Sequence, residues 1–77
     1  MTWLSSWESF VKVVETGSMA AAARRLDCTR AQVSKQIREL ERAFGARLLE
    51  RSTRKLSLTP SGEVFYQHAL RALDAID

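Results

Sequence analysis

The chain has only one cysteine, Cys28, and therefore cannot form an internal disulfide, which is typical of proteins in a reducing cytoplasm. No apolar run approaches the roughly 20 residues that span a membrane. The opening segment MTWLSSWESF lacks the basic leader and apolar block of a secretory signal. With 77 residues the chain is long enough for a single domain with a small core. We expect one cytoplasmic globular domain with no membrane segment.

Histidine is equally scarce, and Cys28 and His68 are the only candidates for a soft metal ligand or a strong nucleophile. A structural zinc site needs about four cysteine or histidine ligands at close spacing, and the chain lacks them. No pair of acidic residues flanks either residue in a catalytic arrangement. We therefore predict no enzyme activity, no metal and no cofactor.

Positive charge, in contrast, is concentrated in about one third of the chain. Residues 30–55 carry eight basic and three acidic side chains, a net charge of +5, whereas the remaining residues carry four basic and six acidic ones, a net charge of −2. Scattered charge usually forms a solvated face. A cluster over consecutive elements instead favours an anionic partner, of which nucleic acid is the commonest.

Two short helices are predicted in the first third of the chain. The first, over residues 2–15, starts at Thr2 or at a capping box of Ser5 and Glu8. Gly17 ends it, and Ser18 caps a second helix over residues 19–26, whose run of four alanines allows a close neighbour. The apolar stripe of the first helix comprises Trp3, Trp7, Phe10, Val11 and Val14.

The third predicted helix is the most informative segment, TRAQVSKQIRELERAF, from Thr29 to Phe44. Thr29 and Gln32 have the spacing of a capping box at its start, and Gly45 ends it. Cationic and amide side chains occupy its outer face. This arrangement is typical of a helix that enters the DNA major groove with its back against a core. The expected core side comprises Val33, Ile37, Leu40 and Phe44.

A hairpin and a final helix complete the chain. Residues 48–51 and 56–58 are expected to form the two arms of the hairpin around a polar tip. Thr59 then caps a helix over residues 60–77 that starts at Pro60. Its apolar stripe comprises Phe65, Ala69, Ala72, Leu73 and Ile76. The predicted fold class is all-α with a small β-hairpin wing, a winged helix-turn-helix over residues 1–59 followed by a long C-terminal helix.

The candidate DNA contacts lie on the outer face of the third helix and around the hairpin. In the first turn, Arg30 is suited to bind guanine and Gln32 adenine, although Gln32 has the alternative role of only closing the capping box. Residues further along such a helix tend to contact phosphate. The full set comprises Thr29, Arg30, Ala31, Gln32, Ser34, Lys35 and Arg38 on the helix, with Arg51, Arg54 and Lys55 on the hairpin.

Several of these residues have a simpler alternative role. Arg38 and Arg42 are within reach of nearby glutamates, such as Glu41, for surface ion pairs worth less than about 1 kcal/mol each. Arg54 is expected near a minor groove, where the negative potential is enhanced, whereas exposed hairpins also carry charge simply for solubility. Cys28 is expected as buried filler between the second and third helices, and the alternative there is a thiol redox switch.

The ordered motifs of the chain resemble the N-terminal DNA-binding domain of LysR-type transcriptional regulators over nearly all 77 residues. The matching stretches are FVxVVExGS from Phe10, AAxxL from Ala22, VSKQIRxLE from Val33, FGxxLLER from Phe44, Arg54, and LTxxG from Leu58. Each motif alone is weak, whereas the ordered set is highly specific. The resemblance implies a helix-turn-helix over about residues 19–38 and a wing over about residues 48–58.

The resemblance also implies a homodimer joined through the final helix, with Phe65, Ala69, Ala72, Leu73 and Ile76 at its interface. The alternative is that this helix packs back onto its own domain, and Phe65 is a candidate for both. Two such subunits are expected to contact an inverted-repeat site in double-stranded DNA. Full-length relatives carry a C-terminal effector-binding domain, which these residues do not include. Small-molecule control is therefore expected only of a longer protein.

The chain departs from the common family pattern at the start of the third helix. Thr29-Arg30-Ala31-Gln32 replaces the usual Ser-Gln-Pro-Ala, so the base-reading residues differ. Asp27 stands in the turn where many helix-turn-helix motifs have glycine. The predicted function is sequence-specific DNA binding in a bacterial regulator, in the cytoplasm and on the nucleoid. The main alternative is a winged helix that binds a protein partner, against which the charge of +5 argues.

Overall fold

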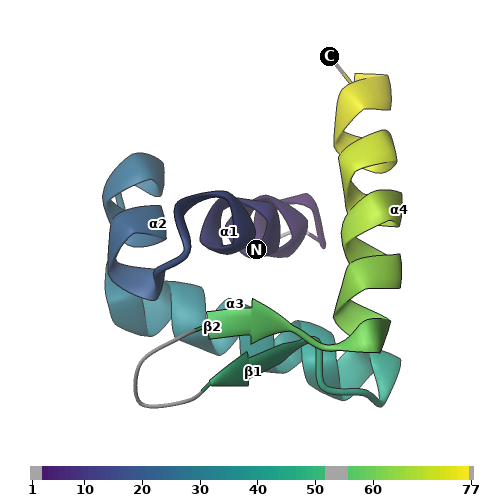
Figure 1. The fold of residues 1–77 in the computed structure, drawn as a ribbon. Coiled ribbons are helices and arrows are strands. Elements are labelled where there is room, and N and C mark those ends of the chain that lie inside the picture. Colours follow the sequence, from purple (N-terminus) through teal and green to yellow (C-terminus); the bar gives the residue numbers. More distant parts are fainter. Residues whose placement is uncertain (1–2, 52–55, 77) are drawn as a thin grey trace.

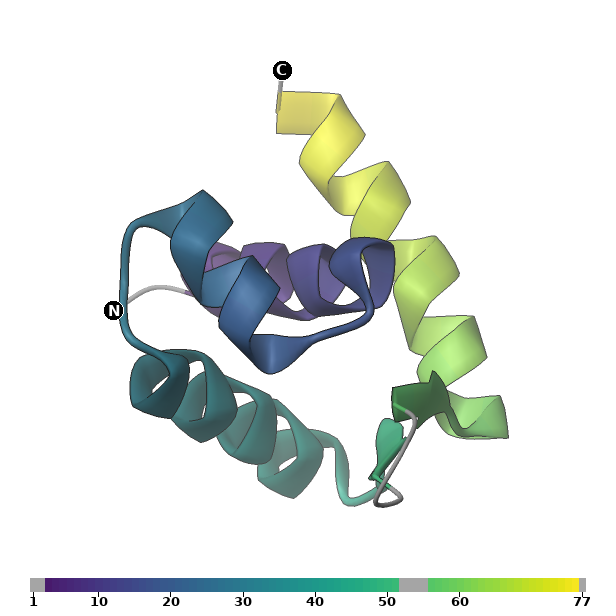
Figure 2. The same cartoon turned by 60° about the vertical axis from the view of Figure 1, so that its left-hand side comes forward.

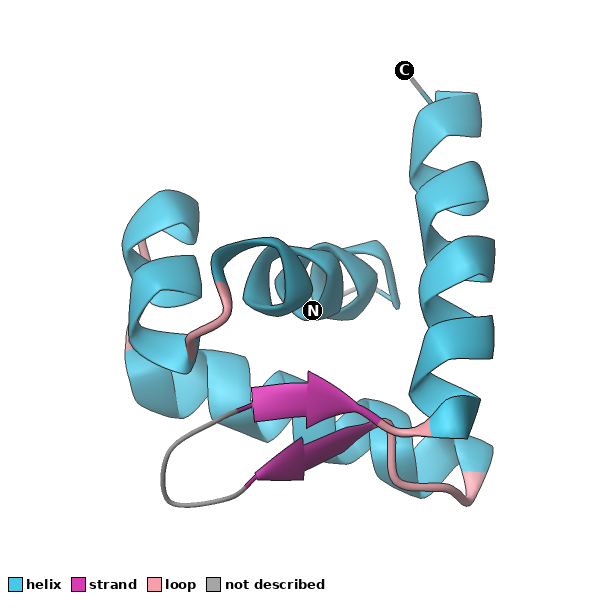
Figure 3. Cartoon of the chain, viewed as in Figure 1, coloured by secondary structure: helices cyan, strands magenta, loops and turns pink. Residues whose placement is uncertain are grey.

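Four helices and a two-stranded hairpin follow one another in the predicted order (Figure 1, Figure 3). The computed structural model describes residues 3–51 and 56–76. The strands pair antiparallel, with Leu49 opposite Leu58 and Arg51 opposite Leu56. The fold class predicted from the sequence is confirmed. The elements are α1 (Trp3–Thr16), α2 (Met19–Leu26), α3 (Arg30–Phe44), β1 (Leu49–Arg51), β2 (Leu56–Leu58) and α4 (Pro60–Ile76).

Local chemistry sets the helix boundaries. The hydroxyl of Ser18 accepts a hydrogen bond from the backbone N–H of Ala21 at 3.0 Å, which caps α2. Gly17 and Gly45 follow α1 and α3 with φ of +76° and +66°, a conformation that glycine adopts without steric cost. Because α1 already begins at Trp3, Ser5 lies inside the helix, and the alternative start at a Ser5 capping box is wrong.

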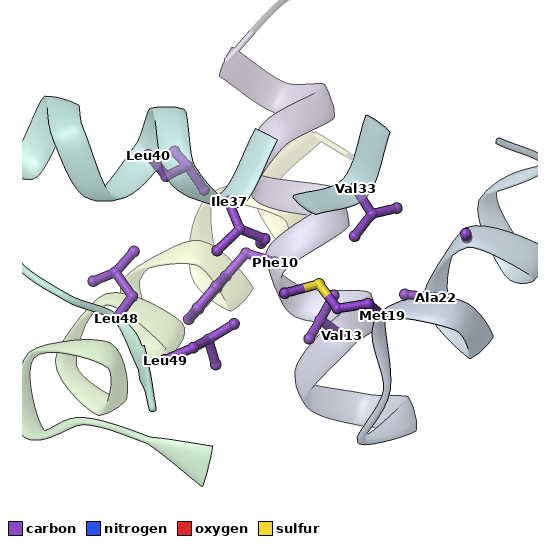
Figure 4. Packing of buried hydrophobic residues seen from close by; sticks show 10 residues of the cluster. Phe10, Val13, Met19, Ala22, Val33, Ile37, Leu40, Leu48 and Leu49 are labelled. Carbon is purple, nitrogen blue, oxygen red and sulfur yellow. The ribbon is translucent and has the colours of Figure 1, made fainter. Parts of the chain in front are cut away.

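The core is built around α1, which packs against α2, α3 and α4 (Figure 2). Figure 4 shows Phe10 and Val13 of α1 meeting Ile37 of α3, with Leu48 and Leu49 closing the side toward the hairpin. None of the helices in the described part of the chain is long and apolar enough to cross a membrane. The buried cluster comprises Phe10, Val13, Met19, Ala22, Ala23, Val33, Ile37, Leu40, Leu48 and Leu49.

The buried surface of α1 is wider than the stripe predicted for it. Phe10 and Val11 are buried as predicted, but Trp7 and Val14 are only half-buried, and Val13 is fully buried although it falls outside the stripe. A helix that contacts three neighbours buries more than one face, so a single period of 3.6 residues underestimates its core side.

The prediction that Phe44 belongs to the core is wrong, because half of its surface, 50%, is exposed. Phe44 is the last residue of α3, where the helix ends. Its partner is Phe65 of α4, with the ring centroids 4.8 Å apart. The end of α3 therefore contributes to the contact with α4 and not to the centre of the fold.

The first half of α4 packs back onto the domain through aromatic contacts. The ring of Phe65 meets Trp7 and Phe10 of α1 edge to face, with centroids 5.8 and 5.2 Å apart. The C-terminal half of α4 extends away from α3 and the hairpin (Figure 1). The alternative role considered for Phe65, packing within its own chain, is thus present in the structure.

Thr59 and Gly62 join the hairpin to α4. The N–H of Thr59 donates to the carbonyl of Leu48 at 3.1 Å, and its hydroxyl donates to the carbonyl of Arg47. The same hydroxyl accepts from the N–H of Gly62 at 2.9 Å, which caps α4 as predicted. A Cβ atom on Gly62 would lie 1.9 Å from the carbonyl oxygen of Leu48. Only glycine allows α4 to approach β1 this closely.

We expect Gly62→Ala to lower the free energy of unfolding by about 3 kcal/mol, because the added methyl overlaps backbone that cannot move independently of β1. Urea denaturation of the chain measures this change. Gly17→Ala is the matched control, since its positive φ costs about 1 kcal/mol but no other atom lies within 4 Å of the added Cβ. Equal losses in the two variants would show that the contact with Leu48 does not require glycine.

Candidate nucleic-acid interface

A tight turn joins α2 to α3. Asp27 has a left-handed backbone with φ 56° and ψ 49°, a conformation that aspartate tolerates better than most residues. The N–H groups of Asp27 and Cys28 donate to the carbonyls of Arg24 and Ala23, at 3.3 and 3.0 Å, and so close the end of α2. Cys28 is half-buried and packs against the core. It is therefore less enclosed than the fully buried residue predicted at this position.

The start of α3 is held by the predicted capping box, which is confirmed. The hydroxyl of Thr29 accepts from the N–H of Gln32 at 3.1 Å, and Oε1 of Gln32 accepts from the N–H of Thr29 at 2.9 Å. A two-point contact with adenine needs both the oxygen and the NH₂ group of a glutamine. Because Oε1 already accepts from the backbone, a two-point contact of Gln32 with adenine would compete with the capping box.

The outer face of α3 is exposed and its back is enclosed. Val33, Ile37 and Leu40 have no exposed surface. Ser34 is half-buried, and its hydroxyl accepts from Nη1 of Arg38 at 3.1 Å. Figure 2 shows α3 along one edge of the molecule, with α1 and α2 on its inner side. The exposed residues between Thr29 and Arg42 are Thr29, Arg30, Ala31, Gln32, Lys35, Arg38, Glu39 and Arg42.

The cations of this face outnumber its acids and form no ion pairs among the described residues. Within residues 3–51 and 56–76, the one salt bridge joins Lys12 and Glu15 on α1, with Nζ and Oε1 3.1 Å apart. The surface ion pairs considered for Arg38 and Arg42 are therefore not formed among the described residues. Uncompensated cations on an exposed helix produce a positive potential that attracts polyanions.

Glu41 has a role that the sequence did not reveal. Its Oε2 accepts hydrogen bonds from the N–H groups of Leu48 and Leu49, at 2.9 and 3.2 Å. This carboxylate fixes the start of the hairpin against α3, so the two candidate DNA-binding elements have a defined relative orientation. Its partners are backbone groups, which leave no side-chain pattern to recognise. Only the spacing of seven residues between Glu41 and Leu48 hints at the contact.

The hairpin tip lies outside the described residues, and with it Arg54 and Lys55. The side chain of Arg51 is likewise not described, although its backbone belongs to β1. Their contacts with DNA stay predictions. Among the described residues no group of three metal-ligating side chains comes together.

The residues expected at a dimer interface lie in different environments on α4. Ala69 has no exposed surface because its own domain encloses it, and its place at a dimer interface stays a prediction. Phe65 is half-buried in the aromatic contacts described above, while Ala72 and Leu73 are half-buried nearer the C-terminal end. The side chain of Ile76 is not described. Among the described side chains of α4, the large apolar residue Val64 is 60% exposed, and the predicted stripe does not include it.

The packed helix pair, the exposed cationic helix and the hairpin together define a winged helix-turn-helix domain. A family model described as "Bacterial regulatory helix-turn-helix protein, lysR family" matches residues 4–63. The chain therefore belongs to the LysR family, as its motifs indicated, and it is a DNA-binding domain of this type.

Relatives of known sequence agree with this assignment. The chain is 47% identical over 66 residues to the probable HTH-type transcriptional regulator LtrA of Klebsiella pneumoniae, covering 86% of this chain and 21% of the relative. It is 43% identical over 68 residues to the HTH-type transcriptional regulator BenM of Acinetobacter baylyi, covering 88% of this chain and 22% of the relative. The chain thus spans about a fifth of the length of these relatives.

Solved structures match the whole domain. The crystal structure of a complex of BenM_DBD with benA site 1 DNA has a TM-score of 0.93 and 39% identity, and the match covers 99% of this chain and 85% of that chain. The crystal structure of a CbnR_DBD–DNA complex has a TM-score of 0.92 and 37% identity, and the match covers 97% of this chain and 86% of that chain.

We expect Gln32→Glu to preserve the melting temperature and to weaken binding to duplex DNA about fivefold or more. Glutamate serves equally well in a capping box and its charge suits a helix N-terminus, but the same charge repels phosphate when it faces DNA. Thermal denaturation and fluorescence anisotropy with a labelled duplex measure the two effects. Gln32→Ala is the control, with a loss of about 1 kcal/mol in stability from the broken cap. Wild-type affinity in Gln32→Glu would place this residue away from the DNA.

Proposed function

We propose that this chain binds double-stranded DNA with sequence preference, with α3 in a major groove, as one half of a homodimer on an inverted-repeat site. The observation that carries the proposal is the outer face of α3, whose cations are exposed and unpaired among the described residues while its back is fully buried. A helix with this division matches the width and potential of a major groove.

Positions along α3 suggest a division of labour. Arg30 and Ala31 lie in the first turn, where side chains reach base edges, and Arg30 has the fork of donors that guanine accepts. Lys35 and Arg38 lie one and two turns further along and are suited to phosphate. The hydroxyl of Ser34 accepts a hydrogen bond from Arg38 in this structure. It becomes available to contact a DNA phosphate once the side chain of Arg38 turns to DNA.

The hairpin and α4 complete the proposed complex. Arg54, with Arg51 and Lys55, is proposed to contact the adjacent minor groove or its phosphates, since the strands that carry the tip are fixed to α3 through Glu41. The C-terminal half of α4, including Leu73, is proposed to join two copies. Similar solved structures are DNA complexes of BenM_DBD and CbnR_DBD, which supports this arrangement.

A longer protein would add control to this binding. The relatives are about five times as long as the matched region, and we propose that an effector-binding domain in such a protein responds to a small molecule. Action on DNA also places the protein in the bacterial cytoplasm, at the nucleoid. A winged helix that binds only a protein partner is the competing function, and titration with a random duplex at low salt separates the two.

We expect Lys35→Ala to weaken binding to a preferred duplex about fivefold or more, because it removes one charge from the outer face of α3. Arg71→Ala is the matched control. It also removes one exposed positive charge, but from α4 and not from α3. Nη2 of Arg71 lies 3.2 Å from Nδ1 of His68. Fluorescence anisotropy measures both affinities, and circular dichroism verifies that both variants are folded. Equal effects of the two substitutions would remove the assignment of the contact face to α3.

Binding is also expected to fall steeply with salt, with a slope of log K against log [salt] of about −0.9 for each phosphate contact. Measurement of the affinity across a series of potassium chloride concentrations gives this slope. A complex whose affinity does not change with salt would contradict the electrostatic basis of the proposal.

A further inference from the structure

One polar contact lies inside the apolar contact between α1 and α3. Ser9 and Gln36 are only 3% and 6% exposed, and the hydroxyl of Ser9 donates a hydrogen bond to Oε1 of Gln36. Each is adjacent in the chain to a fully buried apolar residue, Phe10 and Ile37 respectively. The contact is therefore enclosed within the packing between α1 and α3.

The position of Gln36 on α3 ties this contact to the candidate DNA-binding face. Gln36 shares the buried stripe with Val33 and Leu40, whereas the residue before it, Lys35, is exposed. Successive residues of an α-helix are about 100° apart around its axis. Whatever fixes the rotation of Gln36 therefore fixes the direction in which Lys35 and the first turn of α3 point.

Apolar contacts alone fix this rotation poorly. The hydrophobic effect is non-directional and depends on the area removed from water, which changes little when a helix turns slightly. A hydrogen bond, in contrast, weakens steeply when its donor and acceptor leave their preferred geometry. A buried polar pair thus resists a rotation that the surrounding aliphatic side chains would accommodate.

We infer that Gln36, held by Ser9, is a positioning residue for base recognition, which sets the rotation of α3 in the major groove. The inference rests on the proposed function. Contacts to base edges need their side chains within about 0.5 Å and 10–20° of the productive geometry. Contacts to phosphate, made by long and flexible cations, tolerate larger errors. Loss of the pair therefore reduces discrimination between sequences more than it reduces affinity for DNA in general.

Stability alone does not account for such a pair. Replacement of both partners of a buried hydrogen bond by apolar groups of similar shape is often neutral or stabilising. Methionine has nearly the shape of glutamine, and alanine is close to serine in size. The double variant Ser9→Ala with Gln36→Met therefore removes the Ser9–Gln36 hydrogen bond together with both of its polar groups and without a large cavity.

The experiment uses two DNA probes of equal length. One is a duplex that the wild-type chain selects from a random pool, and the other is an unrelated duplex. We expect the double variant to bind the unrelated duplex within about twofold of the wild type and to lose about tenfold in the ratio of the two affinities. A selection repeated with the variant should enrich a broader set of sequences.

Two further variants separate positioning from general loosening of the core. Ile37→Val shortens a fully buried neighbour on α3 and leaves the hydrogen bond intact. The ratio of its affinities for the two duplexes should therefore stay that of the wild type. Ser9→Ala alone is measured as well and should lose discrimination in the same direction, which keeps the test valid if the double variant does not fold. Circular dichroism and the melting temperature are recorded for each variant.

A folded double variant that keeps the wild-type ratio would overturn the inference and leave the proposed function intact. An equal loss of discrimination in Ile37→Val would also overturn it, because the effect would then follow core stability. A wild-type chain that binds both duplexes equally at all salt concentrations would overturn the proposed function, and the inference with it.

Discussion

The contact between α1 and α3 is the constraint on which the rest of the structure depends. Four residues of α3 are buried, Val33, Gln36, Ile37 and Leu40, and they all belong to one stripe of the helix. The cations of the DNA-binding face lie outside that stripe and are consequently turned outward. The same packing that stabilises the fold therefore creates the functional surface, and no separate device is needed to expose it.

A second set of contacts orients the hairpin and α4 relative to α3, and several of them involve the backbone of Leu48. The N–H of Leu48 binds the carboxylate of Glu41, and its carbonyl accepts from the N–H of Thr59. The same carbonyl oxygen faces Gly62, where there is no room for a Cβ atom. The helices α3 and α4 and the hairpin thus meet at Leu48.

Most of the fold could be predicted from the sequence because its boundaries have local causes. The bounds of α2, the Thr29 capping box and the left-handed Asp27 each depend on a few neighbouring residues. The errors concern contacts between distant segments. Phe44 continues the apolar period of α3, but half of its surface is exposed and its ring contacts Phe65 at the end of the helix. Val13 lies outside the stripe predicted for α1 but is fully buried. In the site, the exposed face of α3 was predictable, whereas Glu41 and the Ser9–Gln36 pair were not. Their partners lie seven and 27 residues away and follow no period.

The triple use of Leu48 has a consequence for how this segment can change in evolution. Side chains between Gly45 and Leu48 are partly or fully exposed at Ala46 and Arg47, so their identity is only loosely constrained. The number of residues in this loop, in contrast, is tightly constrained. An insertion or deletion of one residue here would move the N–H of Leu48 away from Glu41 and its carbonyl away from Thr59 at the same time. Variation in this corner should therefore occur by replacement of amino acids at constant loop length.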